Sequence, residues 1–234
     1  MLPKVLITGA TSGIGAALAG RYAGRAELLL TGRRPAGSLV HALPQGARYV
    51  EADQSVPETA ADRIAAAMTR CNWTALDLAI LNAGMGKAGD PALEQTSTIR
   101  ETLDVNLSAT IALALRLHAP LATARGTLVL VGSTARRGAP AFASYAAAKA
   151  GLDGLGRALA EEWRGRVAVR IIHPGPVATD IHAKAGHDPG RARRVFASPE
   201  AMARMIERAV SRRRARLTIS FPHYLADAAT PWRR

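Results

Sequence analysis

The chain has 234 residues, nearly half of them apolar, a formal net charge of +13 and one cysteine, Cys71. This length fits one α/β domain that can bury a core without disulfides or metals. A lone cysteine excludes an internal disulfide and fits a reducing compartment. We expect no signal peptide, because the apolar run after Lys4 already forms the first strand, and no membrane span. These features predict a cytoplasmic protein.

Arginine accounts for most of the positive charge. Of the 31 basic residues, 27 are arginine, and residues 191–234 carry 11 arginines against three acidic residues. Such a segment can bind nucleic acid or an anionic membrane surface. No zinc-finger spacing, aromatic stripe or known nucleic-acid module accompanies it. We interpret it as a solvated arginine-rich face and keep the anionic partner as the alternative.

Strand-like and helical patterns alternate along the chain. The predicted strands cover residues 5–8, 27–31, 48–51, 76–81, 126–132, 168–172 and 217–220. The predicted helices cover residues 13–24, 57–70, 95–119, 144–163 and 199–213, the last with Ser198 as a cap. Continuously apolar strands are typical of parallel sheets covered on both faces. The pattern predicts an α/β fold, with one doubly wound, seven-stranded parallel sheet flanked by helices on both faces.

The stretch from Thr8 to Gly15, TGATSGIG, follows the first strand and begins the first helix. Glycines let the backbone turn sharply and approach a phosphate, and the first helical turn directs free N–H groups at negative charge. Glycine spacing alone is a weak signal, but the strand before it and the helix after it supply the context that the motif requires. It predicts a binding site for a nucleotide pyrophosphate.

A second ordered group of residues lies further along the chain. Tyr145 and Lys149 form a Y-x-x-x-K pair, and a spacing of four places both side chains on one helix face. Ser133 and the triplet Asn82–Gly84 each end a predicted strand, Asn106 lies in a predicted helix, and PGPVAT occupies residues 174–179. Together these motifs resemble the short-chain dehydrogenase/reductase family, from residue 8 to about residue 220.

The resemblance implies a Rossmann-type domain spanning residues 1–234, with a substrate loop at about residues 180–198. It also implies a nicotinamide cofactor and hydride transfer between a carbonyl and a secondary alcohol. The implied catalytic set is Asn106, Ser133, Tyr145 and Lys149. The implied cofactor contacts are Gly9, Thr11, Ser12, Gly13, Ile14, Gly15, Arg33, Arg34, Asp53, Asn82, Ala83, Gly84, Tyr145, Lys149, Pro174, Gly175, Val177 and Thr179. No metal site is expected, because the histidines show no ligand spacing with cysteine or carboxylate.

The residue types suit this chemistry. Reducing a ketone leaves negative charge on oxygen, which needs a proton donor. A phenol is an acid but a poor base at neutral pH, and an ammonium one helical turn away would lower its pKa. We therefore expect Lys149 to lower the pKa of Tyr145, Ser133 to orient the substrate oxygen, and Asn106 to hold a water beside Lys149, the last as the resemblance implies.

The end of the second predicted strand bears on the cofactor. NAD is usually held there by a carboxylate, whereas this strand ends Thr31-Gly32-Arg33-Arg34. Guanidinium groups bind phosphate through paired donors. This favours NADP(H) over NAD, with the alternative that one arginine stacks on the adenine and both cofactors bind.

The substrate is a carbonyl or alcohol that the sequence does not identify. The predicted pocket walls are residues 85–89, 134–142 and 177–194, where Arg136 and Arg137 either meet an acidic substrate or face solvent. Gly132 departs from the family, which often has a second serine there, and we interpret His173 as structural. The long helices 95–119 and 144–163 suit a dimer or tetramer. The alternative function is a catalytically silent, cofactor-sensing binding protein.

Overall fold

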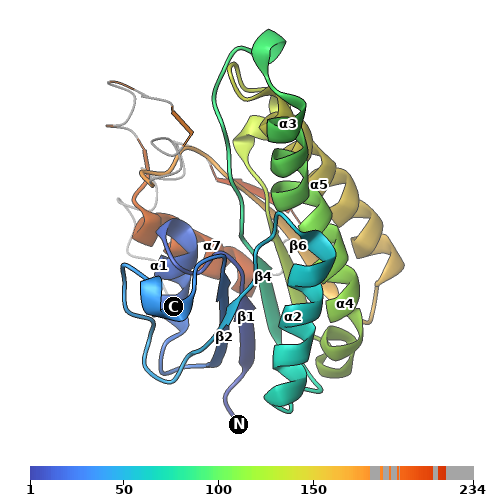
Figure 1. Cartoon of the computed structure of the whole chain (residues 1–234). Helices are drawn as coiled ribbons and strands as arrows, with labels where there is room; N and C mark the ends of the chain where they lie inside the picture. The colour runs from blue at the N-terminus through green and yellow to red at the C-terminus, as the bar shows by residue number, and fades with distance from the viewer. Residues whose placement is uncertain (180–184, 187–189, 191–193, 195, 213–215, 220–234) are drawn as a thin grey trace.

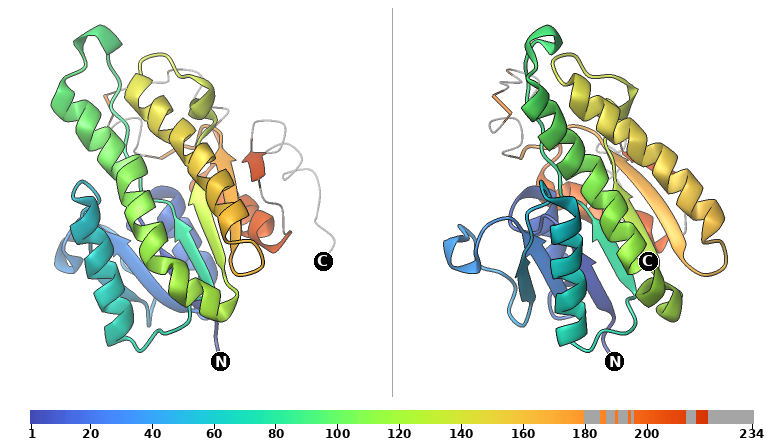
Figure 2. Two further views of the ribbon diagram at one scale, coloured as in Figure 1. Left: turned by 90° about the vertical axis from the view of Figure 1, so that its right-hand side faces the viewer. Right: turned by 45° about the vertical axis from the view of Figure 1, so that its right-hand side comes forward.

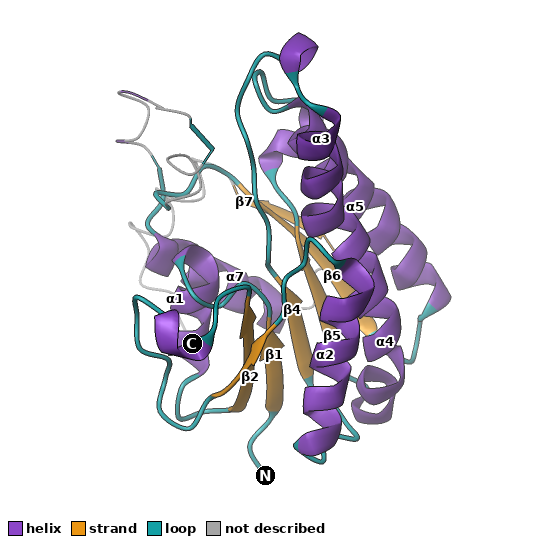
Figure 3. Ribbon diagram, in the orientation of Figure 1, coloured by secondary structure: helices purple, strands orange, loops and turns teal. Residues whose placement is uncertain are grey.

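The computed structural model describes residues 1–179, 185–186, 190, 194, 196–212 and 216–219. Three layers make up this part of the chain, with a parallel sheet between two layers of helices (Figures 1 and 3). The seven strands of the sheet stand in the order β3-β2-β1-β4-β5-β6-β7, and every neighbouring pair is parallel. The predicted doubly wound sheet is confirmed.

The strands lie close to their predicted positions. Their bounds are β1 Lys4–Ile7, β2 Glu27–Gly32, β3 Arg48–Glu51, β4 Leu78–Leu81, β5 Thr127–Val131, β6 Ala168–Pro174 and β7 Arg216–Ile219. Alternate side chains of one strand enter opposite cores: Leu6 joins one apolar cluster, whereas Val5 and Ile7 join the other. Both faces of β1 are therefore covered, which explains why its sequence is continuously apolar.

The helices divide between the two faces of the sheet. Helices α1 (Gly13–Tyr22) and α7 (Pro199–Ser211) cover one face, and α2 (Pro57–Arg70), α4 (Ala109–Ala124) and α5 (Ala143–Glu162) lie side by side over the other (Figure 2). The predicted cap of α7 is confirmed, since Ser198 Oγ accepts a hydrogen bond of 3.1 Å from the backbone N–H of Ala201. Ile206 of α7 is buried in the core on the first face, and Leu113 of α4 in the core on the second.

The predicted helix at residues 95–119 is more complex in the structure. It consists of α3 (Thr96–Leu103), a π-helical turn (Asp104–Ser108) and α4, which continues past Pro120 to Ala124. Within the described residues, this stretch is long and apolar enough to be considered as a membrane span. Here Leu113, Leu117 and Leu121 are buried in the core beside the sheet, so the stretch serves as a core helix of the fold.

The carboxyl ends of the strands meet along one edge of the sheet. The chain reverses its winding between β1 and β4, because β2 and β3 lie on one side of β1 and all later strands on the other. In open α/β sheets, ligands bind at this edge beside such a reversal. The segments that follow β1, β2, β4, β5 and β6 therefore converge there, and they carry nearly all of the predicted site residues.

Candidate active site

A cavity of about 690 Å³ opens at this edge of the sheet. Two predicted site residues, Gly15 and Asn106, lie outside its lining. Every other predicted residue lines it: Gly9, Thr11, Ser12, Gly13, Ile14, Arg33, Arg34, Asp53, Asn82, Ala83, Gly84, Ser133, Tyr145, Lys149, Pro174, Gly175, Val177 and Thr179.

The glycine loop requires glycine at specific positions. Gly9 and Gly13 have positive φ angles of +64° and +54°, which residues other than glycine rarely adopt. A Cβ atom on Gly15 would lie 2.1 Å from the carbonyl oxygen of Gly9. Gly15 thus stands behind the cavity wall and allows α1 to pack against the loop. Ser12 makes no side-chain cap, so the first turn of α1 faces the cavity with donors for an anion.

Thr8 connects the ends of β1 and β4. Its Oγ1 accepts hydrogen bonds of 3.0 Å from the backbone N–H groups of Asn82 and Ala83. In return, the Asn82 side-chain amide donates to the carbonyl oxygens of Thr8 at 3.1 Å and Gly9 at 3.4 Å. Thr8 is buried and was not among the predicted contacts. Its role is to hold the two phosphate-side loops together.

The far end of the cavity is polar and lies beyond β2 and β3. Arg33 is exposed, and the backbone of Arg34 is fixed by Tyr49, whose hydroxyl donates a hydrogen bond of 2.7 Å to the Arg34 carbonyl. Asp53 Oδ1 accepts from both the backbone N–H (3.0 Å) and the hydroxyl (2.9 Å) of Ser55, which orients its carboxylate. Glu101, from α3, also lines this cavity and was missed, because nothing in its local sequence marks it.

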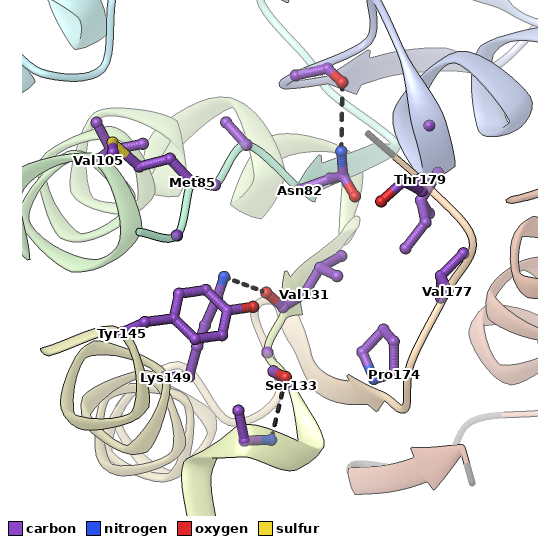
Figure 4. A pocket seen from close by; sticks show the side chains of 18 of the residues that line it. Asn82, Met85, Val105, Val131, Ser133, Tyr145, Lys149, Pro174, Val177 and Thr179 are labelled. Atoms are coloured by element: carbon purple, nitrogen blue, oxygen red, sulfur yellow. Dashed lines mark hydrogen bonds between the residues drawn. The ribbon is translucent and has the colours of Figure 1, made fainter. Parts of the chain in front are cut away.

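Tyr145 and Lys149 extend from α5 toward Val131 and Ser133, with Pro174, Val177 and Thr179 across the cavity (Figure 4). Lys149 is 3% exposed, and its Nζ donates a hydrogen bond of 3.2 Å to the carbonyl oxygen of Val131. That nitrogen lies 5.6 Å from the centroid of the Tyr145 ring. Ser133 lies two residues after the end of β5, and its Oγ accepts a hydrogen bond of 3.1 Å from Ala135 N–H.

Burial controls the protonation of this pair. It raises the pKa of Tyr145 above its usual value of 10, and the hydrogen bond with Ser133 lowers it by less. Burial also lowers the pKa of Lys149 to about 8. The prediction that the pKa of Tyr145 is lowered is therefore wrong for the protein alone, because burial raises this pKa more than the hydrogen bond with Ser133 lowers it. Tyr145 is a protonated donor at neutral pH.

Asn106 is completely buried in the π-helical turn. Its side-chain amide donates to the carbonyl oxygens of Met85 at 2.7 Å and Thr102 at 2.9 Å, and its Oδ1 accepts from Met85 N–H at 3.3 Å. A Cβ atom on Gly84 would lie 2.8 Å from Asn106 Oδ1 and 3.3 Å from Lys149 Nζ. Asn106 therefore holds the segment after β4 against Lys149.

The segment after β6 closes the cavity on the α7 side. Gly175 N–H donates a hydrogen bond of 2.7 Å to Ile219 O in β7, and Val177 forms an isolated bridge with Ala197. The Thr179 methyl group approaches the glycine loop, since a Cβ atom on Gly13 would lie 3.0 Å from it. Most of the predicted substrate loop at 180–198 lies outside the described residues.

The described substrate side of the cavity includes Met85, Gly86 and Phe142, whose ring packs edge-on against Tyr145 with centroids 6.2 Å apart. Neither arginine predicted near its mouth lines the cavity. Arg136 is bound to Asp153 at 3.6 Å, and Arg137 is exposed. The described residues also contain no group of three or more His, Cys, Asp or Glu side chains that could hold a metal.

Comparison with known proteins gives consistent similarities. A curated relative, the cyclic-di-GMP-binding biofilm dispersal mediator protein of Escherichia coli, is 30% identical over 78% of this chain and 76% of its own. Galactitol 2-dehydrogenase of Cereibacter sphaeroides is 31% identical, over 76% and 72% respectively. A solved short-chain dehydrogenase from Sphingobium yanoikuyae in complex with NADPH is 26% identical, covers 93% of this chain and 87% of its own, and superposes with a TM-score of 0.76.

The match to a family is broader than any single relative. Residues 3–190 match the short chain dehydrogenase family. The matched range includes every predicted site residue, from the glycine loop to Thr179. The chain therefore belongs to the short-chain dehydrogenase family of oxidoreductases.

Proposed function

We propose that this protein transfers hydride between NADP(H) and a carbonyl or secondary alcohol, with Tyr145 as the acid and base. One observation carries the proposal. A single cavity connects a glycine loop suited to a pyrophosphate with the side chains of Ser133, Tyr145 and Lys149. One continuous cavity therefore offers a site for the pyrophosphate of the expected cofactor and a site for its reacting nicotinamide.

The residues present fit a dinucleotide. Gly9 and Gly13 line the cavity without side chains, so a phosphate could approach the backbone there, and the first turn of α1 supplies N–H donors. Arg33 and Arg34 line the cavity where the adenosine ribose would lie, and guanidinium groups suit a 2′-phosphate. The NADPH-bound relative supports the same choice. Asp53 would contact the adenine and Thr179 the nicotinamide carboxamide.

In the direction of reduction, a bound nicotinamide cofactor would supply the hydride for the carbonyl carbon. The Tyr145 hydroxyl gives its proton to the carbonyl oxygen, and the electron pair of the O–H bond remains on the phenolate. Lys149, with a pKa of about 8, is mostly cationic at neutral pH and stabilises that phenolate. Ser133 donates a hydrogen bond to the substrate oxygen as charge develops on it. Oxidation of an alcohol reverses these steps.

The test is a panel of carbonyls and alcohols followed by NADPH absorbance. We expect at least one turnover reaction, lost about 10³-fold or more in Tyr145→Phe, because the proton donor is removed while the ring is retained. Binding of NADPH, followed by its fluorescence, should be nearly unchanged in that variant. No turnover on any substrate class, or a Tyr145→Phe variant as active as wild type, would refute the proposal.

The cofactor preference has its own test. Replacing both Arg33 and Arg34 with alanine should weaken NADPH binding by about 10- to 100-fold relative to NADH, because charge-assisted contacts to the 2′-phosphate are lost. If the ratio of the two affinities did not change, the preference for NADPH would be refuted.

The single-domain organisation, the homo-oligomer and the cytoplasmic location remain predictions. Light scattering would check the oligomeric state. The silent binding protein is not favoured, because the side chains for chemistry are all present.

A further inference from the structure

A polar cluster lies behind the cavity wall, around the buried carboxylate of Asp153. Its Oδ1 is 3.0 Å from His173 Nε2, and its Oδ2 is 3.6 Å from an Arg136 nitrogen and also bonds the Arg216 guanidinium. Asp153 is 8% exposed and His173 is 0% exposed. None of these four residues lines the cavity. The cluster is therefore distinct from the groups that would touch substrate or cofactor.

The cluster connects α5, the turn after β5, and the two strands β6 and β7. Asp153 follows Tyr145 and Lys149 at intervals of four residues, so the three side chains share one face of α5. Arg136 lies in the 3₁₀ turn η4 (Thr134–Arg137), for which Ser133 is the N-cap. His173 directly precedes Pro174 in β6. The carboxylate thus ties the Ser133 turn and the end of β6 to the helix that carries Tyr145.

His173 supports the Ser133 turn from a second side. Burial and the nearby Arg136 lower its pKa, so the ring is neutral and its Nε2 donates to Asp153. Its Nδ1 has no hydrogen-bond partner in the described part of the chain and faces Gly132. A Cβ atom on Gly132 would lie 2.4 Å from that nitrogen. The imidazole occupies the space beside the residue that precedes Ser133.

We propose that Asp153 is a positioning residue for hydride transfer: through Arg136 and His173 it fixes the Ser133 hydroxyl relative to the Tyr145 hydroxyl. The inference rests on the proposed function. Ser133 has to meet the same substrate oxygen as Tyr145, and the two residues come from different elements. A displacement of about 1 Å between such groups can cost about 10²-fold in rate. An ion pair buried behind both elements limits that displacement.

The chain offers a matched control in Glu207. This carboxylate also binds two arginines, Arg21 and Arg25, the latter at 2.6 Å, and its side chain is 18% exposed. It connects α1 and α7 on the opposite face of the sheet from α5. Removing its charge should destabilise the fold in the same way as removing that of Asp153, without loosening the Ser133 turn.

The experiment compares Asp153→Asn with Glu207→Gln. We expect kcat on a substrate from the carbonyl panel to fall about 10- to 100-fold in Asp153→Asn, with the NADPH dissociation constant changed less than about twofold. Deuterium uptake by the peptide 132–138 should be at least about fivefold faster, because its amides are protected only while the turn is held. Glu207→Gln should leave kcat and the uptake of that peptide unchanged.

The outcomes separate this inference from the proposed function. If wild type turns over no substrate, the proposed function fails, and deuterium uptake still tests whether Asp153 fixes the Ser133 turn. Equal kcat values for the two variants, or unchanged uptake at 132–138, would overturn the inference. If Asp153→Asn fails to fold, Arg136→Gln replaces it, since Asp153 then keeps His173 and Arg216. That variant should show the same faster uptake and lower kcat, and the absence of these effects overturns the inference equally.

Discussion

Adding a side chain at Gly132 should destabilise this protein. A Cβ atom there would lie 2.4 Å from Nδ1 and 2.8 Å from Cε1 of His173, whereas unstrained contacts are about 3.5 Å or longer. His173 is fully buried and bonded to Asp153 on its other side, so the ring cannot move by the required distance without disturbing that bond. A serine side chain at position 132 therefore clashes with His173.

The magnitude follows from two costs. Overpacking a close-packed interior costs about 1–3 kcal/mol. Complete loss of a hydrogen bond to a charged group costs about 1.5–3 kcal/mol, and weakening it costs less. We expect Gly132→Ser to lower the free energy of unfolding by about 2–4 kcal/mol. For a chain of this size, that corresponds to a decrease in Tm of roughly 5–15 °C.

The assay is urea unfolding of a double-mutant cycle. His173→Ala removes the clash together with the hydrogen bond, so Gly132→Ser should cost about 2 kcal/mol less in that background. Gly154→Ser is the control, since Gly154 lies in α5 and a Cβ atom there would meet nothing within 4 Å. A clash between position 132 and His173 would be excluded if the two losses in free energy of unfolding were additive, or if Gly132→Ser were as stable as the control.

Two further predictions concern the cavity. Tyr49→Phe should weaken NADPH binding about fivefold with little effect on NADH, because the hydrogen bond that fixes the Arg34 carbonyl is worth about 1 kcal/mol; titration of cofactor fluorescence measures both, and equal losses would contradict it. The lowered pKa of Lys149, about 8, means that the unfolded state binds more protons between pH 8 and pH 10.5, so stability should rise across that window. Lys149→Met should abolish this contribution, which amounts to about 3 kcal/mol. The contribution would be excluded if the difference in free energy of unfolding between wild type and Lys149→Met were the same at pH 7.5 and at pH 10.

Local patterns were sufficient to predict the layered architecture. Apolar periodicity identifies strands and helices because a parallel strand buried on both faces must be apolar throughout, as in the run from Val5 to Ile7. The role of the glycine loop was predictable for a similar local reason: at position 15, only a residue without Cβ fits against the carbonyl oxygen of Gly9. The π-helical turn at Asp104–Ser108 was not predicted; its Asn106 bonds Met85, which lies in the segment after β4 and is distant in sequence.

The sequence by itself determined the order of the elements, the identity of the catalytic candidates and the spacing that places Tyr145 and Lys149 on one helix face. Tertiary structure alone decided that Arg136 turns away from the cavity toward Asp153, and that burial raises the pKa of Tyr145. It also decided that His173 fills the space left by Gly132. The physical reason is that spacing along the chain fixes local geometry, whereas burial and charge pairing depend on segments that meet only when the sheet has formed.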